Sequence, residues 1–252
     1  MPLIIISSLY YYLLKNIDYS LLYEITGNGL NKPSYIFGSI SLNDPRAFNF
    51  SDSVYIGIAN TAVFVLETHP DSVAKYLRDL QKFTKNTTAQ NPLAAEMKGS
   101  ENTIPSHFLY GIARTLKKKY DGLGGELEET EDHLLSEDPE DEHNEDLETL
   151  LKLFAKGNLN NIYGEIQQYY ADDYFEERSD KLTSSILNLL KKETLFASVA
   201  VALLPGEHGI LAKLKKAGYQ VRPVNATFTG YAKTYPIDFG SYLTLKYLYL
   251  KF

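Results

Sequence analysis

The sequence predicts an α/β (α+β) fold with a mixed central sheet built from the N- and C-terminal segments. Strand-forming runs cluster towards the two ends of the chain, and helical periodicity dominates the residues between them. At 252 residues and 44% hydrophobic composition, the chain is long enough to bury a large core. We therefore expect strands from both ends to share one sheet, with the helical middle region forming one wall of a cleft.

The first strands are expected at residues 21–27, LLYEITG, and 34–40, SYIFGSI. Gly27 ends the first run and a Lys-Pro pair precedes the second, so the two runs predict a hairpin. A short helix is expected near 51–59. The continuous apolar run TAVFVLE, at 61–67, is typical of a strand buried on both faces.

A helical middle region follows, beginning at Pro70 and Asp71, which open the amphipathic pattern DSVAKYLRDLQKF. Further helical patterns cover residues 92–98, 106–119, 147–156, 160–171 and 176–192.

The chain returns to strand at 194–204, continues as a helix closed by Gly218, and enters another strand at 219–224. This order predicts a βαβ unit with a right-handed crossover. The Tyr-rich extension at 226–252 mixes period 2 with aromatic residues, so an edge strand is expected there.

The N-terminal segment, residues 1–20, is apolar but has no basic residues ahead of its apolar run and no Ala-x-Ala-like cleavage site. Its apolar run is also shorter than the ~20 residues that a membrane-spanning helix needs. We expect a packed terminal element, or the remnant of a trimmed export signal, and no membrane span. The main domain is expected over residues 21–225.

Charge is concentrated in one acidic segment, residues 126–148, which holds 13 of the 32 acidic residues and no Lys or Arg. The remaining chain has 25 basic and 19 acidic residues, a net of +6, without the dense basic stripe of a nucleic-acid-binding protein. Within the segment, residues 134–146 are expected to form an exposed, mobile loop between two helices, because few apolar side chains offset the entropy of ordering. His133 and His143 lie among these acids, and loose cation binding is the alternative to a solvated surface.

Several short motifs resemble, in order and spacing, the TraB/GumN family, which includes the TIKI-type metal-dependent proteases. They are LLYEITGNGLNKPSYIFGSI, VFVLE, EERSDKL and LLPGEHGILAKLKKAGYQVRPV, with LEET and GNL in the helical middle. The similarity extends over residues 21–225. The resemblance implies a metalloprotease-like fold with a cleft, a metal-dependent hydrolase activity, and a bacterial cell envelope or periplasmic location.

In such proteins two strands each run into Gly-x-x-His, and the two imidazoles with nearby carboxylates hold a divalent metal. This sequence departs at both places. The first motif keeps Gly38 but has Ser41 in place of histidine, and the second has Ala200 and Leu203 in place of its glycine and histidine. The alignment implies that Ser41 and Leu203 lie close together at the carboxyl ends of neighbouring strands.

Glu67 and Arg178 are the family-equivalent cleft residues that remain, and the resemblance places both at the catalytic position beside Ser41 and Leu203. Arg178 can face the cleft and clamp a carboxylate or substrate carbonyl, or form a buried ion pair with Glu67 that joins two elements. Ser41 as a nucleophile would need a base, and no Ser-His-Asp spacing is recognisable.

An alternative metal site combines Glu67, His69 and His208 as relocated ligands for manganese, cobalt or zinc. Glu67 and His69 are two residues apart, so in a strand they share one face. The competing interpretation is that His69 caps the helix that opens at Pro70, and that His208 is an ordinary residue of an exposed turn.

The sequence therefore favours a degenerate, pseudoenzyme-like protein that binds a peptide, protein or small ligand without a metal or other cofactor. One alternative is a metal-dependent hydrolase or peptidase with the relocated ligands. Another is an interaction module that forms oligomers through its Tyr-rich termini. No nucleic-acid partner is expected.

Overall fold

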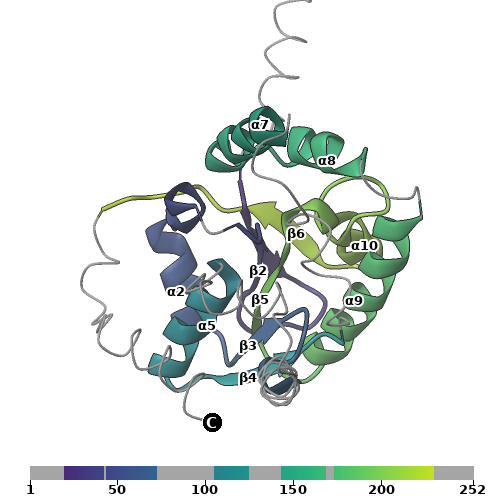
Figure 1. The fold of residues 1–252 in the computed structure, drawn as a ribbon. Helices are drawn as coiled ribbons and strands as arrows, with labels where there is room; N and C mark the ends of the chain where they lie inside the picture. The colour runs from purple at the N-terminus through teal and green to yellow at the C-terminus, as the bar shows by residue number, and fades with distance from the viewer. Residues whose placement is uncertain (1–19, 43, 73–104, 125–142, 169–172, 230–252) are drawn as a thin grey trace, which may run out of the picture.

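The computed structural model describes residues 20–42, 44–72, 105–124, 143–168 and 173–229, and its centre is a six-stranded sheet of order β4-β3-β5-β2-β1-β6 (Figure 1). The strands are β1 (Leu22–Thr26), β2 (Ser34–Ser39), β3 (Val63–Leu66), β4 (Lys119–Gly122), β5 (Leu195–Ala200) and β6 (Gln220–Pro223). Segments from both ends of the chain thus share one mixed sheet, which confirms the predicted fold class.

Strand directions give the sheet one long parallel part. β2, β5, β3 and β4 run parallel to one another, whereas β1 is antiparallel to both β2 and β6. The β1–β2 pair is the predicted hairpin. The β5–α10–β6 unit also forms, but its second strand lies beyond β2 and β1 rather than beside β5.

Helices cover both faces of the sheet. Figure 1 shows α2 and α5 on one side and α9 and α10 on the other, with α7 and α8 at one end. Their bounds are α2 (Asp52–Asn60), α5 (Pro105–Thr115), α7 (His143–Lys156), α8 (Leu159–Gln167), α9 (Tyr174–Leu190) and α10 (Ile210–Lys216), with short 3₁₀ turns η1 (Pro45–Phe48) and η2 (Val201–Leu203).

Alternating side chains of the central strands divide between two hydrophobic clusters, as the period of two in a strand requires. On β5, Ala197 and Val199 pack in the cluster that includes Leu182 of α9. Phe196 points to the opposite cluster, where Ile58 of α2 lies. Helices cover both faces of the sheet, so every residue of β3 is buried. This explains why β3 is a continuous apolar run in the sequence.

One strand was not predicted. The helix expected over 106–119 ends at Thr115, and β4 begins at Lys119. Lys117 adopts φ of 54°, a left-handed conformation that stops a helix. Lys118 then donates from Nζ to the carbonyl oxygens of Ala59 and Thr61, at 2.5 and 2.7 Å, which fixes the turn against the end of α2.

Other expectations are corrected or lie outside the described residues. The acidic segment was expected to be a loop as far as residue 146, but α7 begins at His143; residues 125–142, with His133, lie outside. The strand expected to 204 ends at Ala200, where η2 follows. Three further expected elements also lie outside the described residues: the helical patterns at 73–83 and 92–98, and most of the edge strand at 226–252. Within the described part of the chain, no helix has the length and apolar character to cross a membrane.

Candidate functional site

The candidate site lies at the carboxyl edge of the parallel strands, where ligands gather in α/β sheets. Glu67 directly follows β3, and Ala200 is the last residue of β5. Arg178 reaches this edge from the first half of α9, where its helical face is buried. Only 8% of Glu67 and 9% of Arg178 is exposed.

Glu67 and Arg178 form a buried ion pair. Arg178 donates from Nη2 and Nε to Glu67 Oε2, at 2.6 and 3.2 Å. Its Nη1 donates to the hydroxyl oxygen of Tyr174 at 2.7 Å. The other carboxylate oxygen, Oε1, accepts the backbone N–H of Ala200. Both oxygens of Glu67 are therefore engaged, one by a cation and one by the end of β5.

The charge of Arg178 is stabilised by this arrangement. Burial opposes the charged form and would lower the pKa of Arg178, but the Glu67 carboxylate and then the Tyr174 hydroxyl raise it. The net result is a pKa above the ordinary value, so the guanidinium stays charged at every accessible pH.

Ser41 and Leu203 follow the carboxyl ends of two adjacent parallel strands, with Ser39 of β2 opposite Ala200 of β5. Leu203 lies in η2 and is 1% exposed. Ser41 is half-buried, two residues beyond the end of β2.

Gly38 serves close packing here rather than a tight turn. It lies inside β2, and a Cβ atom at this position would be 2.8 Å from Leu204 Cδ1 and 3.2 Å from Val201 Cα. The absence of a side chain lets η2 rest directly on β2.

His69 and His208 occupy separate places. His69 Nδ1 accepts the N–H of Asp71 at 3.1 Å, which is the helix-capping role expected at Pro70, and its ring lies 5.9 Å from that of Tyr120. His208 Nδ1 lies 2.9 Å from Glu176 Oε1 on an exposed loop. Glu67 interacts with neither histidine. Among the described residues, no group of three or more His, Cys, Asp or Glu side chains is placed to hold a metal ion.

Two contacts at the ion pair were missed in the sequence. Tyr174 is four residues before Arg178, so helical spacing alone places both side chains on one face of α9. The Ala200 contact is made by the backbone N–H, and a backbone donor leaves no trace in residue type.

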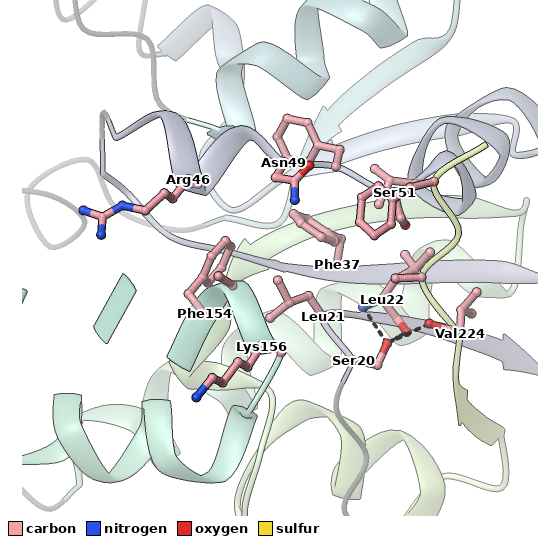
Figure 2. Close-up of a pocket in the computed structure, with 17 residues that line it drawn as sticks. Ser20, Leu21, Leu22, Phe37, Arg46, Asn49, Ser51, Phe154, Lys156 and Val224 are labelled. Carbon is pink, nitrogen blue, oxygen red and sulfur yellow. Dashed lines mark hydrogen bonds between the residues drawn. The ribbon is translucent and has the colours of Figure 1, made fainter. Parts of the chain in front are cut away.

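A separate pocket of about 120 Å³ lies where β1 begins, between η1, the end of α7 and the segment that follows β6 (Figure 2). Its walls include Leu21, Phe37 and Phe154, and Lys156 and Arg46 lie at its rim. The pocket lining includes neither Glu67 nor Arg178. No pattern in the sequence pointed to it, because its walls come from segments far apart in the chain.

Comparison with known proteins gives one result. Residues 114–223 match the sequence model of the TraB/PrgY/gumN family. No curated protein and no solved structure matches the chain significantly. The matched stretch runs from the end of α5 through β6, so it contains Arg178 and Ala200 and leaves Glu67 and Ser41 outside. This stretch of the chain is therefore similar to the TraB/PrgY/gumN family.

Proposed function

We propose that this chain keeps the TraB/PrgY/gumN scaffold as a binding protein and does not cleave peptides with a metal. The observation that carries the proposal is the engagement of both Glu67 oxygens, by Arg178 and by the N–H of Ala200. These three hydrogen bonds occupy three of the roughly four lone-pair sites of the carboxylate. They also hold it against the positive charge of Arg178, which opposes the binding of a metal cation beside it.

The donor set at the same edge leads to the same conclusion. The resemblance implies two imidazole ligands, and the chain has Ser41 and Leu203 at those positions. A leucine side chain has no lone pair, and a neutral serine hydroxyl is a weak substitute for imidazole. These residues do not fit a divalent catalytic ion. The ligand that the scaffold binds belongs to one of three classes: peptide, protein or small molecule.

Calorimetric titration of manganese, cobalt or zinc tests the proposal. The native chain should show no tight one-to-one binding. Ser41→His/Leu203→His should gain affinity for a transition ion, with Ala200→Gly added if needed to free the backbone at the end of β5. Ser41→Asn/Leu203→Asn is the matched control, because it adds polar groups without imidazole. Circular dichroism checks that each variant folds, since Leu203 is buried.

Two results would contradict the proposal. One is tight stoichiometric binding by the native chain that is lost in Glu67→Ala or His69→Ala, which would favour the relocated-ligand hydrolase. The other is the appearance of new peptide termini when the native chain is incubated with a mixed peptide library, if a chelator abolishes them. Library peptides recovered uncut agree with a binding function.

A further inference from the structure

The pocket at the start of β1 has an aromatic and aliphatic lining with an open rim. Phe37 and Phe50 meet edge to face, with ring centroids 5.8 Å apart, and Leu22 and Val54 add aliphatic surface. Figure 2 shows Phe37, Phe154 and Leu21 pointing towards one another across this space.

One wall is an extended strap, residues 224–229, that crosses from β6 to the N-terminal end of α2 (Figure 1). Its side chains alternate: Val224, Ala226 and Phe228 line the pocket, whereas the residues between them bond to α2. Ser53 Oγ donates to the Asn225 carbonyl oxygen, the N–H of Asp52 donates to the Thr227 carbonyl oxygen, and Thr229 donates from N and Oγ1 to Asp52 Oδ2.

Phe228 is 61% exposed, although it faces the pocket. Together with the apolar lining of the pocket, this exposed ring forms a contiguous apolar surface that a further apolar group can cover.

The N-terminal segment leaves the described structure at this rim. Ser20 lines the pocket, and its hydroxyl donates to the carbonyl oxygens of Leu22 and Val224, at 2.7 and 2.9 Å. These bonds, drawn in Figure 2, hold the exit point of the chain against the strap. The segment before Ser20 has the sequence MPLIIISSLYYYLLKNIDY, in which an apolar stretch is separated from Ser20 by Asn16 and Asp18. Asn and Asp favour turns, so the stretch can reverse towards the pocket.

We propose that this pocket is the docking site for the apolar stretch at residues 3–14 of the same chain. One large apolar side chain of the stretch enters the pocket, and its neighbours cover Phe228. The size is suitable: an engineered apolar cavity of about 150 Å³ takes up benzene, and this pocket measures about 120 Å³ and is open at its rim. The short tether makes the intramolecular contact effective at any protein concentration.

Chemical protection tests the proposal, and the chain is suited to it because it contains no cysteine. A single cysteine at Ala226 faces the pocket, and one at Asn225 on the same strap faces away. Maleimide should label Ala226→Cys at least five-fold more slowly than Asn225→Cys. Adding Leu9→Asp and Leu13→Asp should remove most of that difference, because charged side chains oppose docking, and should leave the Asn225→Cys rate unchanged.

Cross-linking identifies the occupant. Tyr11→Cys/Lys156→Cys, treated with a short bis-maleimide, should give an intrachain product several-fold faster than Tyr11→Cys/Lys215→Cys, whose second cysteine is on α10. Equal labelling of the two strap cysteines, or equal cross-linking of the two pairs, would overturn the proposal. A product linking two chains would assign the pocket to a second copy instead, and would overturn docking within one chain.

Discussion

At the scale of single residues, the main feature of the candidate site is the buried ion pair of Arg178 and Glu67, which joins α9 to the end of β3. Removing one partner of such a pair leaves the other charge buried without compensation. The pair therefore holds α9 against the end of β3.

Arg178→Met should lower the free energy of unfolding by about 3–5 kcal/mol, measured by urea denaturation. Lys119→Met is a control, because Lys119 pairs with Glu193 at the surface, with 73% of its side chain exposed; its cost should be below about 1 kcal/mol. In the double variant Glu67→Gln/Arg178→Met the loss should be smaller than the sum of the single losses, since no uncompensated charge remains. Additive losses would show that the two side chains do not interact in solution.

At the scale of elements, the turn after β3 and the edge strand β4 are held in close contact by a glycine. A Cβ atom on Gly122 would lie 2.5 Å from the backbone nitrogen of His69 and 2.6 Å from its Cα. These are backbone atoms, so a side chain rotation cannot relieve the clash.

Gly122→Ala should therefore destabilise the protein by about 1–3 kcal/mol, the usual cost of overpacking. Gly164→Ala is the matched control: Gly164 lies within α8, and a Cβ atom added there would have no neighbour within 4 Å apart from its own helix backbone and chain neighbours. There alanine should stabilise by up to about 1 kcal/mol, because glycine is a poor helix former. Thermal unfolding of both variants measures these changes in stability. Equal changes in the two variants would mean that β4 shifts freely to admit the methyl group.

At the scale of the whole molecule, the two ends of the chain depend on each other. β1 lies between β2 and β6, and its residues Tyr23–Thr26 pair with Gln220–Pro223, from the far end of the described chain. Neither the hairpin nor the last strand completes its hydrogen bonds alone, so we expect both ends to unfold together.

Ile25→Ala, at a fully buried position of β1, should lower the free energy of unfolding by about 2–5 kcal/mol. Far-UV circular dichroism and tyrosine fluorescence should report one shared midpoint in urea. Ile56→Ala, on the exposed side of α2 with 38% exposure, should change stability by no more than about 0.5 kcal/mol. Two separated transitions in the Ile25 variant would show that the ends of the sheet unfold independently.

The sequence by itself determined most of the local elements of the sheet and indicated a family resemblance. Apolar runs and period-two alternation predicted β1, β2, β3, β5 and β6, because such patterns depend only on which faces are buried. The short β4, with its first two residues exposed, lacked that signal. The order and spacing of short motifs were enough to suggest the TraB/GumN resemblance.

Tertiary structure decided what these elements bring together. The ion pair joins residues 111 positions apart. Glu67 also accepts the backbone N–H of Ala200, and a backbone contact cannot be predicted from residue type. Tertiary structure also decided that β6 pairs with β1 rather than β5, and that the strap, η1 and α7 enclose a pocket. The physical reason is common to all three: burial patterns specify which side of an element faces inward, whereas long-range packing selects the partner that covers it.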